Sequence, residues 1–310
     1  MQTDKTPPDL VSSDCATRYP LLFLHGICVR DTIRRGHWGR ILSTLESHGS
    51  HIFLGYQDAL GTFENNAHQI AATIEDVLLQ TNSEKVNIIA HSKGGVDARC
   101  LISSLGLENK IASLTTLSSP HHGSKTIGDL FRIGKPIFKL LAFPVNAFYR
   151  ALGDDSPDFF TVCRELSPRY MEEFNLNNPD LPDIYYQHYG TLINSAFNDV
   201  ILAFSYLIIR ICDGPNDGIV ALSSTQYGRT ENYKGVFCTQ TRRGVSHIDI
   251  VDFRHRSLVR ASRNVGSKSV DAVDRLADRQ ASVAAPASLL VNNIPDFFVA
   301  LVAALKAAGY

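Results

Sequence analysis

The feature that most constrains the fold is a strand-length apolar run that leads directly into a serine. Residues 86–90 are apolar apart from one asparagine, and His91-Ser92-Lys93-Gly94-Gly95 follows at once. Apolar residues recur at helical spacing just beyond Gly95. A tight strand-to-helix turn with small residues around a serine presents its hydroxyl beside a helix N-terminus. Ser92 is therefore a candidate nucleophile, although an ordinary glycine-containing turn would show the same pattern.

The rest of the chain repeats this alternation of strand and helix. Continuous apolar runs are typical of parallel strands that are covered on both faces. The sequence therefore predicts an α/β fold with a mostly parallel, doubly wound sheet and right-handed crossovers. Strands are expected at residues 19–24, 51–54, 86–90, 111–117, 184–189 and 236–238. Helices are expected at residues 38–45, 66–80, 166–175 and 294–307, while residues 203–211 fit either element and residues 270–284 fit a helix or a tether.

Composition limits the partners of this chain. The 310 residues suit a polar tail at residues 1–18 followed by one domain at residues 19–310. A net charge of -1 gives no reason to expect a nucleic acid or a charged membrane surface. The six cysteines include no C-x-x-C pair, which argues against a zinc or redox site. We expect no organic cofactor, and no apolar stretch reaches the ~20 residues of a transmembrane segment.

Residues 125–160 interrupt the strand–helix rhythm. They are rich in large apolar side chains, contain Pro136 and Pro144, and show no strand pattern. A solvated loop would be less apolar. The segment is therefore either a buried pair of helices or a mobile lid that covers an apolar cleft and opens at a lipid surface.

A serine nucleophile needs a histidine base, and that base needs a carboxylate to orient it. Downstream of Ser92, Asp217 lies in a Gly-Pro-Asn-Asp-Gly turn that follows an apolar run. Asp213, at the start of the same segment, is its rival. Either aspartate could also serve only to form the turn.

The best candidate for the base is His247, in the loop that follows the last expected strand. His188 lies inside a strand pattern and before either aspartate, so packing is the better interpretation. His255 follows a stretch that looks helical and is a weaker candidate. Three further histidines precede the acid in the chain and are expected to pack or to line the site: His91, His121 and His122.

Five segments in a shared order resemble the bacterial true lipases of family I, both the Pseudomonas-type and the firmicute triacylglycerol lipases. These segments are residues 19–27, 90–95, 117–124, 216–220 and 247–251. The resemblance covers roughly residues 19–257 and implies an α/β-hydrolase fold with a lid at about 125–160. It implies that Ser92 is the nucleophile, Asp217 the acid and His247 the base. The backbone N–H groups of Ile27 and Lys93 would form the oxyanion hole.

The resemblance also implies a structural calcium near the catalytic histidine. Asp249 matches one aspartate of that site, and Asp199 is the candidate for the other. Backbone carbonyls near Phe253 and Ser257 would complete it, because calcium prefers oxygen ligands. From the residues alone, Asp199 could instead cap a helix. Asp249 could be an ordinary surface carboxylate.

The predicted function is the hydrolysis of carboxylic esters through an acyl-enzyme, with a triacylglycerol lipase as the first choice. The substrate partner would be a lipid or ester, met at an oil–water interface. One alternative is a carboxylesterase for short-chain or polyester substrates, and another is a hydrolase-fold binding protein without turnover. The resemblance implies secretion. No signal peptide is visible in the polar residues 1–18, so the alternatives are a processed form of a secreted protein or a cytoplasmic protein. Any folding chaperone is left open.

Overall fold

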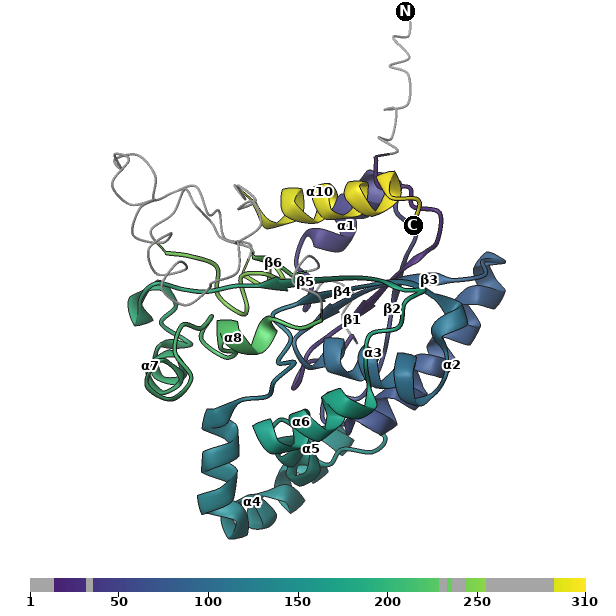
Figure 1. The fold of residues 1–310 in the computed structure, drawn as a ribbon. Coiled ribbons are helices and arrows are strands. Elements are labelled where there is room, and N and C mark those ends of the chain that lie inside the picture. Colours follow the sequence, from purple (N-terminus) through teal and green to yellow (C-terminus); the bar gives the residue numbers. More distant parts are fainter. Residues whose placement is uncertain (1–13, 32–35, 229–232, 236–242, 255–292) are drawn as a thin grey trace, which may run out of the picture.

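The computed structural model describes residues 14–31, 36–228, 233–235, 243–254 and 293–310. Its strands form a six-stranded sheet in the order β2-β1-β3-β4-β5-β6, and every neighbouring pair is parallel (Figure 1). This confirms the predicted fold class. The strands are β1 (Leu21–Leu24), β2 (Ile52–Leu54), β3 (Val86–His91), β4 (Ile111–Leu117), β5 (Tyr185–Gly190) and β6 (Tyr233–Gly235).

Helices cover both faces of the sheet. In chain order these are α1 (Ile41–Ser47), α2 (Phe63–Thr81), α3 (Lys93–Ser104), α4 (Lys125–Ala151), α5 (Phe159–Glu165), α6 (Pro168–Asn177), α7 (Ala203–Cys212), α8 (Leu222–Thr225) and α10 (Ile294–Ala307). Short 3-10 helices are η1 (Glu108–Lys110) and η2 (Ala196–Asn198). The strand expected at 236–238 and the helix or tether expected at 270–284 lie outside the described residues.

Strand β1 shows how the sheet divides the core. Leu21 and Phe23 point to the face covered by α1 and α10, whereas Leu22 and Leu24 point to the face covered by α2 and α3. Figure 1 shows these two helix layers on opposite sides of the sheet. All four side chains are fully buried, as expected for a central parallel strand.

The last helix of the chain completes the first of these layers. Its bounds match the predicted residues 294–307. Phe298 of α10 is fully buried and packs against Phe23 and Trp38, with ring centroids 6.4 and 6.3 Å away. Tyr310 stacks on Tyr185 of β5 at 4.8 Å. The C-terminal segment is therefore part of the domain core.

The segment predicted as a lid or a buried helical pair forms α4, which consists of two helical stretches joined at a kink. Ser124 caps it by accepting a hydrogen bond from the N–H of Ile127 at 3.2 Å, and Gly134 interrupts its helical geometry. Phe131 is its one buried residue. Most of its other large apolar side chains are exposed, namely Leu130, Ile133, Ile137, Leu140, Leu141, Phe143 and Phe148, whereas Ile127, Phe138, Val145 and Tyr149 are half-buried. The expectation of a helical pair is met by the kink, but the expectation that the pair is buried is wrong.

The ambiguous run at residues 203–211 is also a helix, α7, and it too leaves apolar side chains exposed. Together with the residues just before it, the exposed set is Phe197, Val200, Ile201, Phe204, Leu207 and Ile211. In Figure 1, α4 and α7 lie at the outside of the fold, away from α1 and α10. Within the described residues, no helix combines the length and apolar character needed to cross a membrane.

Candidate active site

Ser92 occupies the sharp turn between β3 and α3. Its φ of 54° and ψ of -127° are unusual for a residue with a side chain, and such backbone strain costs on the order of 1–3 kcal/mol. The N–H of Ser92 donates to the carbonyl of Leu117 at 2.9 Å, which ties the turn to β4. The serine therefore stands at the carboxyl edge of the sheet and at the N-terminus of α3, as the sequence predicts.

Small residues around Ser92 have a steric reason. A Cβ at Gly94 would lie 2.5 Å from the carbonyl oxygen of His25, and one at Gly95 would lie 2.2 Å from Ser119 Oγ. Ala90 is fully buried and its methyl group is accommodated. The glycines after the serine are thus required by the close approach of neighbouring chain segments.

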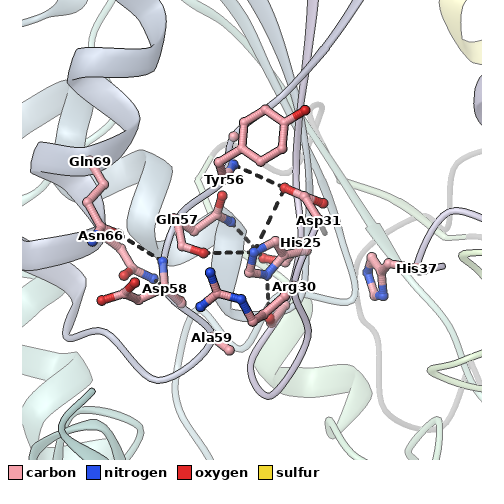
Figure 2. Close-up of polar contacts among 12 residues, drawn as sticks. His25, Arg30, Asp31, His37, Tyr56, Gln57, Asp58, Ala59, Asn66 and Gln69 are labelled. Carbon is pink, nitrogen blue, oxygen red and sulfur yellow. Dashed lines mark hydrogen bonds and ion pairs between the residues drawn. The ribbon is translucent and has the colours of Figure 1, made fainter. Parts of the chain in front are cut away.

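The loop that follows β1 lies directly against the serine. A Cβ at Gly26 would approach Ser92 Cβ to 2.8 Å and Ser92 Oγ to 3.4 Å. Figure 2 shows how this loop is held: His25 Nε2 donates to the Gln57 carbonyl at 2.9 Å, and Gln57 Nε2 donates to the His25 carbonyl at 3.1 Å. Ile27, whose N–H is a predicted oxyanion donor, follows Gly26 in this loop. The second predicted donor, Lys93 N–H, lies in the turn itself.

Asp217 and His247 form a buried hydrogen-bonded pair. Asp217 Oδ2 accepts a hydrogen bond from His247 Nδ1 at 2.8 Å, and the Asp217 carbonyl accepts from the His247 N–H at 3.0 Å. Asp217 Oδ1 accepts from the N–H groups of Ile219 and Val220 at 3.0 and 2.8 Å. Because Nδ1 carries the proton, the neutral imidazole keeps a free lone pair on Nε2.

Thr191 also holds the Asp217 carboxylate, and it was not identified from the sequence. Its hydroxyl donates to Asp217 Oδ2 at 3.1 Å and contacts Ser118 Oγ at 2.7 Å. No motif marks a threonine that follows β5 by one residue, so only the fold identifies it.

The rival acid and the rival bases have other partners. Asp213 Oδ1 accepts from the Lys125 N–H at 2.9 Å, and Asp213 Oδ2 accepts from Thr126, so this carboxylate caps α4. His188 contacts Thr116 Oγ1 at 2.7 Å, and burial together with the charge of Arg99 lowers the pKa of His188 to about 3. His255 lies outside the described residues.

His91 joins the serine turn to the histidine loop. Its Nε2 lies 3.1 Å from the His247 carbonyl, which can only accept, so Nε2 is the donor. Its Nδ1 then accepts from His37 Nε2 at 3.2 Å. Burial, reinforced by neighbouring histidines, lowers the pKa of His91 and of His37 well below 6.5. Both rings are therefore neutral, as this chain of hydrogen bonds requires, and His37 is a second residue that the sequence did not mark.

The predicted calcium ligands come together around an arginine. Arg254 donates to Asp199 Oδ1 at 2.9 Å and to Asp249 Oδ1 at 2.8 Å. Phe253 has a half-exposed side chain, and Ser257 lies outside the described residues. Among the residues that the structure describes, no cluster of three histidine, cysteine or acidic side chains could hold a metal ion. Both oxygens of Asp199 and Oδ1 of Asp249 already bind the Arg254 guanidinium, and this arrangement does not fit the expected calcium, which needs oxygen atoms that are free to coordinate.

A model of the palmitoyl protein thioesterase family matches residues 20–236. The chain belongs to this family. A triacylglycerol lipase of Vibrio cholerae is 32% identical over 238 residues, covering 69% of this chain and 75% of the relative. Triacylglycerol lipase 2 of Saccharomyces cerevisiae is 28% identical over 230 residues, covering 71% and 63%. These relatives confirm the predicted resemblance to lipases.

A solved structure supports the same fold. A metagenomic carboxyl esterase superposes with a TM-score of 0.60 at 16% identity, covering 90% of this chain and 80% of the esterase. The chain spans 34% to 63% of the length of the first curated relatives it matches.

Replacement of Gly94 by alanine tests the packing of the serine turn. The added Cβ would press on the backbone carbonyl of His25, so we expect the Tm to fall by about 2–10 °C. Gly134→Ala is the matched control, because its Cβ would meet only the Phe138 ring at 3.5 Å. Thermal unfolding followed by circular dichroism measures both. Equal Tm values for the two variants would contradict this account of the turn.

Proposed function

We propose that this protein hydrolyses carboxylic esters of the acylglycerol class with Ser92 as nucleophile, His247 as base and Asp217 as acid. The observation that carries the proposal is the 2.8 Å hydrogen bond between Asp217 Oδ2 and His247 Nδ1, in a loop that His91 links to the serine turn. The order of the three residues in the chain is that of α/β-hydrolases. The triacylglycerol lipase relatives support this substrate class.

In this mechanism, Ser92 Oγ attacks the ester carbonyl carbon and its proton passes to His247 Nε2. Asp217 stabilises the imidazolium that results and keeps Nδ1 protonated. No hydrogen bond joins Ser92 Oγ to His247 in the described residues, and such contacts commonly tighten when substrate binds. His247 then protonates the departing alcohol, and water attacks the acyl-enzyme by the same route. The N–H groups of Ile27 and Lys93 would stabilise the oxyanion by about 3 kcal/mol per donor.

The exposed apolar surface supports a lipid substrate. The two sets of side chains on α4 and around α7, which we call the apolar rim, lie on elements that are anchored at the proposed site. A patch of this kind on a soluble protein marks a surface that binds something apolar. An oil–water interface is the partner that fits an ester hydrolase with a rim of leucine, isoleucine and phenylalanine side chains.

Both ends of α4 are fastened close to proposed catalytic groups. At its start, Asp213 caps the helix from a position four residues before Asp217. Beyond its end, Asp154 accepts from the N–H groups of Ala59 and Leu60 at 3.1 and 2.9 Å and pairs with Arg30. Arg30 belongs to the loop that begins with the proposed oxyanion donor. A movement of α4 at a lipid surface would therefore also displace the loop that carries Asp217 and the loop that carries Ile27. This coupling supports the role of α4 as a lid.

A short-chain carboxylesterase and a thioesterase are the rivals within this mechanism. The name of the matching family model raises the thioester as a second kind of substrate. The extent of the apolar rim favours long acyl chains in either case. A binding protein without turnover is the rival of another class, and the paired Asp217 and His247 argue against it. Secretion and a folding chaperone stay predictions.

Replacement of Ser92 by alanine should abolish ester turnover in a folded protein. Loss of the nucleophile typically reduces kcat by about 10⁶-fold. Hydrolysis of a triglyceride series and of a matched long-chain acyl thioester measures the effect and ranks the substrates. Labelling by an organophosphonate should occur in the wild type and be absent from Ser92→Ala. Full turnover by this variant would refute the nucleophile assignment.

Replacement of Asp217 and replacement of Asp213 should have very different effects on kcat. Asp217→Asn should reduce kcat by about 10³–10⁴-fold, because an amide no longer fixes the reactive tautomer of His247. Asp213→Asn should reduce it less than about tenfold, because the remaining carbonyl oxygen can still cap α4. Steady-state kinetics on a soluble ester compares them. The reverse order would transfer the role of the acid to Asp213.

The apolar rim should matter only at an interface. Leu140 and Phe143 are 77% and 82% exposed, so Leu140→Ser together with Phe143→Ser should leave the fold intact. We expect at least a tenfold weaker binding to an emulsified triglyceride and unchanged kcat on a soluble short-chain ester. Leu79→Ser, at an 82% exposed position on α2, is the control. An equal effect of the control would contradict a specific lipid-binding role for the rim.

A further inference from the structure

Arg254 lies where the lipase resemblance requires a metal ion. It follows His247 by seven residues and Asp249 by five. Hydrogen bonds from the Asp249 N–H to the Ser246 carbonyl at 3.0 Å and from the Ile250 N–H to the same carbonyl at 3.1 Å coil this segment tightly. These turns bring the Arg254 guanidinium back to Ser246, the residue before His247.

The guanidinium contacts three side chains from two distant parts of the chain. Its two terminal nitrogens donate to both oxygens of Asp199, and one of them also donates to Asp249 Oδ1 at 2.8 Å and to Ser246 Oγ at 3.1 Å. Asp199 lies between η2 and α7, about fifty residues earlier in the chain. The arginine thereby fastens the histidine loop to the segment that precedes the proposed acid.

The carboxylates of Asp199 and Asp249 need the positive charge of Arg254 because they are buried. The side chain of Asp199 is completely buried, and those of Asp249 and Arg254 are only 8% and 12% exposed. Burial alone would raise the pKa of Asp199, yet the hydrogen bonds from Arg254 and Ser246 lower it below its ordinary value. Two carboxylates at such positions require a positive charge between them, and a guanidinium can bind one of them in a bidentate manner.

We propose that the Arg254 guanidinium takes the place of the calcium ion in this protein, so that the histidine loop is fastened by a cation that belongs to the chain itself. Three of the four carboxylate oxygens, both of Asp199 and Oδ1 of Asp249, already accept N–H groups of Arg254, and the guanidinium lies between the two carboxylates. A second arginine holds the same loop at Asp252. Arg40 donates to this carboxylate through Nε and a terminal nitrogen at 2.7 and 2.6 Å. Fastening of this loop fixes the backbone of His247.

The role of Arg254 as a positioning residue rests on the proposed function, because it presumes that His247 is the base. The proposal that calcium is excluded does not rest on the proposed function, because it concerns only Asp199, Asp249 and the cation between them. The two parts are separated by measuring stability and calcium binding independently of ester turnover.

The first experiment compares the Tm of the full-length wild type after exhaustive chelation with its Tm in millimolar calcium chloride. We expect the same Tm in both and no calcium uptake by calorimetric titration. A Tm that rises with calcium, together with loss of that rise in Asp249→Asn, would overturn the proposal.

The second experiment removes the cation. Arg254→Ala leaves two buried carboxylates facing each other, so its Tm should fall by about 5–15 °C, and calcium should now raise it while magnesium raises it less. Arg243→Ala is the matched control, because Arg243 lies near the same segment but, among the described residues, it binds the Asn198 carbonyl and forms no ion pair with a carboxylate. A fall no larger than that of the control, or no response to calcium, would overturn the proposal.

The third experiment tests whether Arg254 positions His247. At a temperature well below its Tm, Arg254→Ala should show at least a tenfold lower kcat on a soluble ester with little change in KM, and calcium should restore part of that kcat. Arg254→Lys, which keeps a positive charge, should have an intermediate Tm and kcat and serves if the alanine variant fails to fold. Unchanged kcat in Arg254→Ala would overturn the positioning role, whatever the calcium result.

Discussion

The structure depends on one crowded contact, where the strained turn at Ser92 meets the end of β1. The strain is maintained because β3 is central in the sheet and α3 is buried along most of its length, so the turn cannot relax without disturbing both. Gly94 and Gly26 permit the contact, since a side chain at either would collide with the opposing segment. The same contact brings the loop of Ile27 beside the serine. The geometry of the proposed site and the packing of the core therefore depend on the same residues.

The other half of the proposed site is held differently. Within the described residues 243–254, the segment with His247 forms turns instead of a helix or strand, and hydrogen bonds and ion pairs hold it in place. Asp217 binds its imidazole, His91 binds its backbone carbonyl, and Arg254 and Arg40 fasten the loop on either side. A rigid sheet edge thus supplies the proposed nucleophile, while a network of buried polar groups orients the proposed base. Such a network makes a structure rigid only when each of its buried polar groups has a hydrogen-bond partner.

The apolar rim is where this protein departs from ordinary packing. A helix as apolar as α4 would normally bury its apolar face, yet Phe131 alone is buried there. The helix is instead fastened through polar contacts at its ends, by Asp213 and Asp154. This arrangement leaves its apolar side free for a partner without loosening the core. It also explains why the carboxylate of Asp213, the rival acid, caps α4 and does not join the proposed triad.

The sequence by itself determined the parallel sheet, the serine turn, the loop beside it and the bounds of the last helix, because each depends on local periodicity or on sterics within a few residues. It also nominated Asp217 and His247 by chain order, but it left Asp213 open because both aspartates lie in one turn. Tertiary structure alone decided which of the two carboxylates meets His247, which face of α4 is exposed, and that Arg254 lies between Asp199 and Asp249. These outcomes depend on contacts between residues far apart in the chain, and the direction of a side chain toward such a partner is set by packing that no local pattern records.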